Sequence, residues 1–530
     1  MPSALAPAAG AVGRPRYNPW LVALVVALAA FMEVLDTSIA NVALPYMAGS
    51  LGASNDESTW VLTSYLVSNA IVLPISGWLA DFFGRKRFFM TCLVLFTASS
   101  LLCGVAPSLG FLIVARIVQG AGGGGLQPMA QAILADVFPP EQRGLAFALY
   151  GITAVMAPAI GPTLGGWITD NYSWHWIFFI NLPVGALTLL LVARLVEDPP
   201  HLLRAKRAGV RLDYIGIGLL VLGIGALQIM LDRGQEDDWF GSSFIVALAI
   251  LASTCLVALV VWEWFHEQPI IDVRLFTNFN FLSANVMMFM LGVLLFASIV
   301  MLPQFLQTLM GYTAETAGLA LSAGGVVLLL EMPIVGQLTR RVQARYLIAA
   351  GWLGLALGMG YSAQRIDLQL SFATVAWLRV IQVLGLGLLF VPITLAAYTG
   401  VPADKSNSVA GLVNFMRNMG SSVGTSLVTT LTARHAQAHQ VYLVSGTAAD
   451  NRTFQDQVRV LAEHLASAGI GLADAQQQAY ARLYQIVQQQ AQTLAYIDTY
   501  WALAVAAAVM MCLAFVLRPN NPGSGGAAVV

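Results

Sequence analysis

The apolar residues of this chain fall into long blocks, and this pattern limits its possible folds more than any other feature. A helix needs about 20 predominantly apolar residues to cross the hydrocarbon core of a bilayer. Only 10% of the 530 residues are charged and 58% are hydrophobic, too little charge to cover a soluble protein of this size. We therefore expect an all-α integral membrane protein. Fourteen transmembrane helices are expected, at 20–43, 58–80, 88–106, 109–134, 143–168, 174–195, 214–232, 242–264, 281–306, 314–337, 345–363, 371–398, 408–432 and 497–517.

The Lys and Arg residues orient these spans, because cytoplasmic loops carry an excess of both. With the N-terminus inside, 17 of the 26 basic residues fall in cytoplasmic tails and loops. Three clusters, at 85–87, 204–211 and 340–345, account for most of this excess. We therefore expect both termini in the cytoplasm. Residues 1–19 lack the apolar core of a signal peptide and, like 518–530, are expected to form a cytoplasmic tail.

Several classes of function are disfavoured by the sequence. The net charge of −1 provides no basic field for nucleic acid. All four cysteines lie inside apolar blocks, so we expect no disulfide. His435 and His439 have helical spacing, but no third ligand is apparent, so we expect no metal site. We see no nucleotide-binding loop and no nucleophile–base arrangement, and we expect neither an enzyme nor a cofactor.

An internal repeat divides the chain into two halves. The segment Arg116–Gly124 recurs as Arg379–Gly387, an offset of 263. Two weaker matches, Leu44-Pro45 with Leu302-Pro303 and Gly77 with Gly336, have offsets of 258 and 259. Both copies start on the same side of the membrane, which predicts a parallel repeat. We expect an N-terminal six-helix bundle (20–195), a cytoplasmic linker (196–213), two inserted helices (214–264), and a C-terminal six-helix bundle (281–517) that includes a long periplasmic loop (433–496).

Four segments resemble family signatures. Gly77–Arg87 resembles the major-facilitator loop between the second and third helices, and Leu35–Pro45 resembles the first helix of fourteen-span drug:proton antiporters. Ala157–Gly166 is similar to the antiporter signature of the fifth helix, and Asn171–Pro183 is typical of the EmrB-type branch. The chain thus resembles the fourteen-span drug:proton antiporters (EmrB/QacA type) of the major facilitator superfamily over nearly its whole length.

This resemblance implies a bacterial inner-membrane antiporter that exports small amphipathic or drug-like compounds in exchange for protons. Its energy source would be the proton gradient. In Gram-negative members a periplasmic membrane-fusion adaptor and an outer-membrane channel complete the system. A secondary transporter of one metabolite on the same fold is the main alternative, and a non-transporting membrane receptor is a remote one.

Ionisable residues inside the spans are the strongest functional candidates, because a charge in the bilayer core is expensive and should face the bundle interior. Glu33 and Asp36 are three residues apart on one face of the first span, and Arg116 should lie at a similar depth. We expect these three to couple proton binding to transport. Protonation of Asp36 or Glu33 would drive the return to the outward-facing state. A static Asp36–Arg116 pair that stabilises the bundle is the alternative.

The loop signature predicts a conformational latch at the cytoplasmic face. Gly84 permits a tight turn, and the Asp81 carboxylate could cap a helix or pair with a cation in one conformation only. Arg85 and Arg87 complete the latch. Simple retention of the loop in the cytoplasm is the alternative.

Small residues in the fifth span predict close helix contact, with two prolines bending the segment. Packing alone or a seal against leak would both explain them. They are Pro158, Gly161, Pro162, Gly165 and Gly166.

Other polar residues within the spans could line a substrate cavity or bond neighbouring helices. Glu331 and Arg417 should lie at similar depth, as a fixed pair or with Glu331 as a cation or second proton site. Arg379, the repeat partner of Arg116, is expected to be structural. The possible cavity residues are Asn41, Gln119, Gln127, Asn181, Gln304, Glu331, Arg379, Asn414 and Arg417.

Residues 433–496 form the one long hydrophilic segment between expected spans. Residues from about 474 to 496 should form a helix continuous with the last span, and Val458, Leu461 and Leu465 suggest an earlier one. The segment could dock an adaptor or act as a passive spacer.

Overall fold

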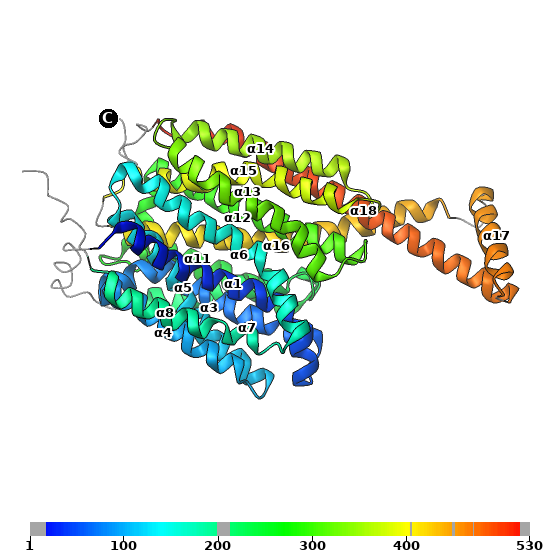
Figure 1. Ribbon diagram of the computed structural model, residues 1–530, viewed down its shortest axis with the longest axis horizontal. Helices are drawn as coiled ribbons and strands as arrows, with labels where there is room; N and C mark the ends of the chain where they lie inside the picture. Colours follow the sequence, from blue (N-terminus) through cyan, green and yellow to red (C-terminus); the bar gives the residue numbers. More distant parts are fainter. Residues whose placement is uncertain (1–16, 199–212, 403–404, 448–450, 470, 520–530) are drawn as a thin grey trace, which may run out of the picture.

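The computed structural model describes residues 17–198, 213–402, 405–447, 451–469 and 471–519. Within these ranges the chain is helical, with no strand. Long helices run side by side in one bundle (Figure 1). This is expected in a bilayer, where the backbone N–H and C=O groups can form hydrogen bonds only within the protein. The first long helix begins and the last one ends at the same end of the bundle, here called the tail end. The basic cluster at 204–211 and most of both tails lie outside the described residues.

The N-terminal half contains the six expected spans and a short additional helix. The last span is broken into two helices at Ile180. The elements are α1 (Pro19–Leu51), α2 (Asn55–Ser58), α3 (Trp60–Phe83), α4 (Arg85–Gly104), α5 (Leu109–Val137), α6 (Arg143–Asn171), α7 (Trp176–Phe179) and α8 (Asn181–Leu195), with the short 3-10 helix η1 (Pro140–Gln142) before α6.

Two inserted helices and the C-terminal half follow. The inserted pair is α10 (Tyr214–Arg233) and α11 (Ser243–Phe265). The short 3-10 helices η2 (Trp239–Gly241) and η3 (Val273–Thr277) flank α11. The C-terminal half comprises α12 (Phe279–Thr308), α13 (Ala314–Leu338), α14 (Ala344–Arg365), α15 (Phe372–Tyr398), α16 (Ser406–Ser445), α17 (Arg452–Ser467) and α18 (Leu472–Ala514).

The expected spans agree with the helices, and two of them need comment. Among the described residues, twelve helices are long and apolar enough to cross a membrane, or thirteen with α6 counted as one span. α6 bends by 42° between Arg143–Pro158 and Ile160–Asn171, where its two prolines lie. α16 contains the expected span 408–432 but is too polar to pass that test. It nevertheless packs between α3, α12 and α18, so its polar residues are buried inside the bundle.

The predicted repeat is confirmed by equivalent helix contacts in the two halves. A Cβ atom on Gly122 of α5 would lie 2.9 Å from the Cys92 carbonyl of α4, and one on Gly385 of α15 would lie 2.8 Å from the Gly351 carbonyl of α14. Cys92 and Gly351 differ by 259 and the two contacting glycines by 263. The same close approach of helices therefore occurs twice.

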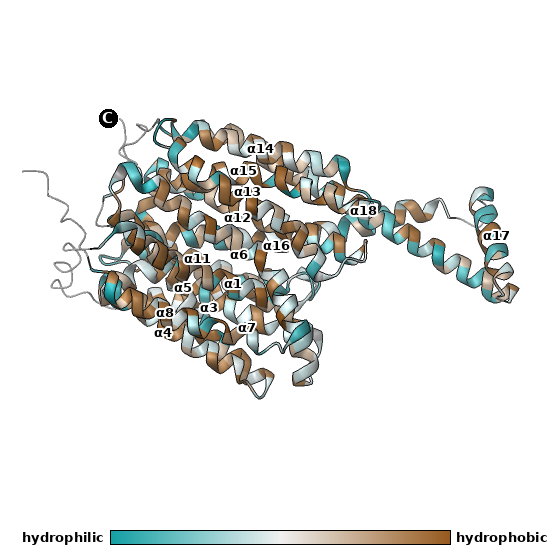
Figure 2. Cartoon of the chain, viewed as in Figure 1, coloured by the Kyte–Doolittle hydropathy of each residue, from teal (hydrophilic) through white to brown (hydrophobic). Residues whose placement is uncertain are grey.

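The hydrophilic segment is a helical extension beyond the membrane bundle (Figure 1). α16 and α18 both continue past the apolar region, and α17 packs on α18 at the far tip. A small apolar core of Val458, Ala462, Leu465, Ala475 and Ala479 holds the tip together. The extension is visibly more hydrophilic than the bundle (Figure 2).

Candidate functional site

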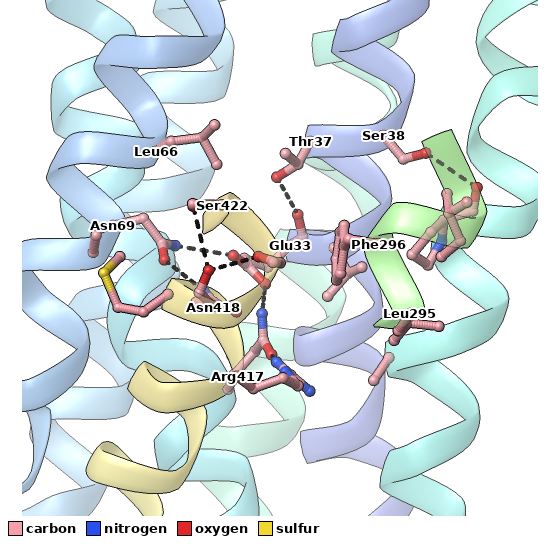
Figure 3. A pocket seen from close by; sticks show the side chains of 18 of the residues that line it. Glu33, Thr37, Ser38, Leu66, Asn69, Leu295, Phe296, Arg417, Asn418 and Ser422 are labelled. Atoms are coloured by element: carbon pink, nitrogen blue, oxygen red, sulfur yellow. Dashed lines mark hydrogen bonds between the residues drawn. The ribbon is translucent and has the colours of Figure 1, made fainter. Parts of the chain in front are cut away.

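A cavity of about 180 Å³ lies between the two halves. One side is apolar, formed by Leu295, Phe296 and Ile299 of α12, and polar residues of α1, α3, α5 and α16 form the other. Gln228 of the inserted helix α10 also lines it. Glu33 and Arg417 approach the cavity from opposite halves (Figure 3). The cavity can therefore accommodate a molecule with an apolar body and a polar group.

Glu33 is held by three donors from the N-terminal half. Its Oε1 accepts hydrogen bonds from the Tyr65 hydroxyl and the Asn69 amide, both at 3.0 Å. Its Oε2 accepts one from the Gln127 amide. The residue is only 3% exposed although it lines the cavity. A carboxylate accepts from all three donors, whereas a protonated carboxyl would place an O–H against one of them.

The two amides that bind Glu33 also bind the opposite half. The Gln127 carbonyl oxygen accepts a hydrogen bond from Arg417 of α16. The Asn69 carbonyl oxygen accepts one from Asn418 of the same helix, at 3.3 Å. Arg417 can only donate, so the Gln127 oxygen must face it and the Gln127 amide nitrogen must face Glu33. The state of Glu33 is thereby linked to contacts between the halves.

Asp36 lies one turn along α1 from Glu33 but outside the cavity lining. Its Oδ2 is 2.6 Å from Arg116 Nη1. Its Oδ1 accepts hydrogen bonds from the amides of Gln119 at 3.0 Å and Asn181 at 2.6 Å. Asp36 is 2% and Arg116 0% exposed. This network joins α1, α5 and α8 in one rigid cluster of the N-terminal half.

Tyr65 connects the two acids. Its ring lies 4.2 Å from the Arg116 guanidinium, and its hydroxyl donates to Glu33. The sequence placed Glu33 and Asp36 on one face and near one another. In the structure they belong to separate networks on adjacent faces of α1, with the Tyr65 side chain between them.

The halves are joined at the tail end by the residues of the expected latch. Asp81 accepts a hydrogen bond at 2.6 Å from Asn407, and Arg85 Nη2 lies 3.3 Å from the Ser406 hydroxyl, both at the start of α16. Arg85 also forms an ion pair at 2.6 Å with Asp136 of α5. These contacts close the bundle at the tail end.

The turn of the latch is as predicted, and two other details differ from the prediction. Gly84 adopts φ +89°, as the tight turn requires. The helix that follows it is capped by Asp198, whose Oδ1 accepts the Lys86 backbone N–H at 2.7 Å, and not by Asp81. Sequence reasoning missed Asp198 because it lies far along the chain. Arg87 is exposed at the surface.

The small residues of α6 contact α1 as close packing requires, with one exception. A Cβ atom on Gly161 would overlap the Ser38 side chain, and one on Gly165 would lie 3.1 Å from Ile39. The Ser38 hydroxyl donates to the Pro158 carbonyl at 3.3 Å. Gly166 has nothing within 4 Å of such an atom, so it makes no comparably close contact.

Of the predicted cavity residues, Asn41, Gln127 and Arg417 line the cavity. Gln119 and Asn181 bind Asp36 instead. Asn414 accepts a hydrogen bond from the Tyr150 hydroxyl and donates to Gln131. Arg379 of α15 is buried near Gly324 of α13 and donates to Ser298 of α12 and to Gln382.

The predicted Glu331–Arg417 pair is wrong. Arg417 turns into the cavity towards Gln127, while the Glu331 carboxylate lies against Gly387 of α15. Glu331 occupies the repeat position of Val72, which contacts Gly124 in the same way. Equal depth along the membrane did not determine which face of the helix each residue occupies.

Sequence reasoning missed three residues that belong to the hydrogen-bond network around Glu33, namely Tyr65, Asn69 and Asn418. A usable signal was present, since Tyr65 and Asn69 have i,i+4 spacing within an expected span. Among the described residues, no group of His, Cys, Asp and Glu is arranged to hold a metal ion.

Comparison with known proteins agrees with this architecture. The sequence profile of the Major Facilitator Superfamily matches residues 26–425. The multidrug export protein EmrB of Haemophilus influenzae is 38% identical over 94% of this chain and 96% of its own length. The fatty acid resistance protein FarB of Neisseria gonorrhoeae is 38% identical over 85% of this chain and 87% of its own.

Among solved structures, the proton:xylose symporter XylE has the same fold. Its TM-score is 0.60 at 15% identity, covering 95% of this chain and 97% of that one. With the profile match, the full-length EmrB relatives and this shared fold, the chain belongs to the Major Facilitator Superfamily and, within it, to the family of the EmrB export proteins.

Proposed function

We propose that the chain exports small amphipathic toxic compounds across a bacterial inner membrane in exchange for protons, with both termini in the cytoplasm. The names of the EmrB relatives and the mixed apolar and polar cavity support this function. The tail end is then the cytoplasmic face, and the structure is the state closed to the cytoplasm.

One observation carries the proposal: Glu33 lines the cavity and sets the orientation of an amide that Arg417 binds from the other half. A proton that reaches Glu33 from the cavity makes the carboxyl a donor. Because Oε1 already accepts from two donors, the proton is placed on Oε2, where it faces the Gln127 amide. That amide then turns its oxygen towards Glu33 and its nitrogen towards Arg417, so that two donors face each other. Protonation therefore weakens the contact between the halves.

This order is opposite to the one expected from the sequence. Protons bind in the state closed to the cytoplasm and favour its opening, which releases them inside and exposes the cavity to new substrate. Asp36 and Arg116 complete the coupling through Tyr65. The Tyr65 hydroxyl donates to Glu33 and its ring lies over Arg116, so a change of charge at Glu33 shifts the position of the ring relative to Arg116. The alternative, a static Asp36–Arg116 pair, predicts loss of folding when Asp36 is neutralised.

The contacts of Asp81 and Arg85 with the start of α16 act as the latch of this closed state. They lie at the cytoplasmic ends of helices that must separate when the cavity opens inward. The close α1–α6 contact at Gly161 and Gly165 acts as the seal of the N-terminal half.

Carboxylate-bearing amphiphiles belong to the proposed substrate range. Arg417 lines the cavity, and its Nη1 has no hydrogen-bond partner. The name of the FarB relative refers to fatty acids. The anionic group of a substrate would therefore bind to Arg417. Glu33 would bind the coupling proton and would not contact the substrate.

The helical extension is the proposed docking surface for a periplasmic membrane-fusion adaptor. The adaptor would connect the transporter to an outer-membrane channel. Its tip and shaft expose large apolar side chains that a spacer would not need, such as Val441 at 74%, Tyr442 at 77% and Leu472 at 74%. A passive spacer would tolerate Tyr442→Ser with unchanged resistance.

Resistance to a panel of toxic compounds in an efflux-deficient strain tests the export function. Wild-type protein should confer resistance, and Asp36→Asn and Glu33→Gln should abolish it while the protein still reaches the membrane. Full resistance with both variants would refute the coupling, and transport of a single metabolite without any resistance would favour the alternative function.

A further inference from the structure

The two inserted helices carry a pair of buried acids that the proposed transport cycle does not use. Asp213 caps α10: its Oδ1 accepts the Gly216 N–H and its Oδ2 the Trp262 indole N–H, both at 2.8 Å. Glu263 lies near the end of α11 and is 0% exposed. Neither of its carboxylate oxygens accepts a hydrogen bond.

The two carboxylates meet at Gly216. A Cβ atom on Gly216 would lie 2.6 Å from Asp213 Oδ2 and 2.6 Å from Glu263 Oε1. The two oxygens are therefore at most 5.2 Å apart, the sum of these distances. A side chain at this position would intrude between the acids, which accounts for glycine there.

Among the described residues, the charged partner that Asp213 meets is a histidine, which is a cation only when it is protonated. His266 Nε2 lies 3.9 Å from Asp213 Oδ2, and the ring is partly exposed. Asp272 adds further negative charge near Glu263 and is itself paired with Lys405. Arg274 donates to the carbonyls of Trp264 and His266 instead. Among the described residues, no Lys or Arg forms an ion pair with Asp213 or Glu263.

A structural explanation for Glu263 would be that it holds the loop after α11. The backbone N–H groups of Ile270 and Ile271 are close to its carboxylate. They are outside hydrogen-bond geometry, however. A charged carboxylate placed to hold a loop would accept short hydrogen bonds from it, so this explanation leaves both oxygens unaccounted for.

We propose that Asp213 and Glu263 form a second proton-binding site, in which the pair shares one proton, on the inserted helices and apart from the acids of α1. Two carboxylates this close and withdrawn from water cannot both stay ionised without a cation. The pair lies at the tail end, so it responds to pH on that side of the membrane.

The site is connected to the closure at the tail end. Asp272 lies beside Glu263 and binds Lys405, the residue directly before α16. The next two residues, Ser406 and Asn407, make the latch contacts with the N-terminal half. Loss of the shared proton places a second negative charge beside Asp272. This charge disturbs the Asp272–Lys405 ion pair and, through it, the start of α16.

Infrared spectroscopy of the purified full-length protein during a pH titration tests the site, because a protonated carboxyl has its own C=O stretching band. The variants are Glu263→Gln, Asp213→Asn and, as control, Glu267→Gln, an exposed acid four residues further on. Wild type and the control should show a carboxyl band that disappears at alkaline pH. Glu263→Gln should lose the part of that band that comes from this pair, while other protonated acids such as Glu33 retain theirs.

Asp213→Asn supplies an independent arm. Asparagine keeps the cap of α10 through its Oδ1 but loses the acceptor for the Trp262 indole N–H, so the circular dichroism of this variant is compared with that of the wild type before the titration. Removing the negative charge of Asp213 from beside Glu263 should change the pH at which the band disappears. An unchanged band in Glu263→Gln, or an unchanged titration in Asp213→Asn, would overturn the proposal. Neither readout depends on transport, so loss of resistance in α1 variants leaves this test unaffected.

Discussion

Glu33→Gln should open the cytoplasmic end of the transporter without any proton. The glutamine amide has the size of the acid and, like the protonated carboxyl, carries a donor towards Gln127. The Gln127 amide then turns, and the hydrogen bond from Arg417 is lost. The structure assigns this contact to the closed state, because Gln127 lies on α5 and Arg417 on α16.

The size of the effect follows from that bond. A hydrogen bond from a charged donor contributes about 1.5–3 kcal/mol, and each 1.4 kcal/mol is about tenfold in an equilibrium. The balance between closed and open cytoplasmic ends should therefore shift by roughly 10- to 150-fold. If nearly all wild-type molecules are closed at the cytoplasmic end, the variant would be a mixture of closed and open molecules.

Distances between two spin labels, measured by double electron–electron resonance spectroscopy, report this shift. Labels at Arg87→Cys and Arg341→Cys, exposed residues of opposite halves at the tail end, report the opening. The exposed Cys512 should first be replaced by Ser. Glu315→Gln, an exposed acid of α13, is the matched control. Equal distance distributions in wild type and Glu33→Gln at alkaline pH would refute the reasoning.

Three further predictions concern other parts of the structure. Asp36→Asn should abolish resistance while membrane levels stay within about twofold of the wild type, as a blot of membrane fractions would verify; misfolded protein would instead support the static pair. Gly161→Val should inactivate transport and lower the melting temperature because its side chain overlaps Ser38, whereas Gly166→Val should change neither. Glu331→Val should retain resistance, since the equivalent contact of the N-terminal half is already made by valine; complete loss would assign Glu331 an active role.

The fold was predictable from the sequence because lipid imposes a simple rule on it. Apolar blocks of sufficient length must be helices, and the repeat of Arg116–Gly124 at Arg379–Gly387 indicated how the helices are grouped. α16 shows the limit of hydropathy. Its polar residues are buried against other helices and the cavity, which composition cannot distinguish from exposure to water.

The candidate site was predictable only in part. Depth along the membrane follows from counting residues, and it placed Arg116 level with Asp36. The face that a side chain occupies depends on helix rotation and tertiary packing, so the same reasoning wrongly paired Glu331 with Arg417. The partners Asn69 and Asn418 come from helices of opposite halves, and their contact has no counterpart in local sequence.

The direct test of the central claim is drug and proton movement in proteoliposomes that contain only the purified protein. The account predicts that an imposed proton gradient drives substrate uptake, that substrate addition in turn moves protons, and that Glu33→Gln and Asp36→Asn abolish both fluxes. Substrate pumping that continues undiminished after the pH and voltage gradients are collapsed would contradict it.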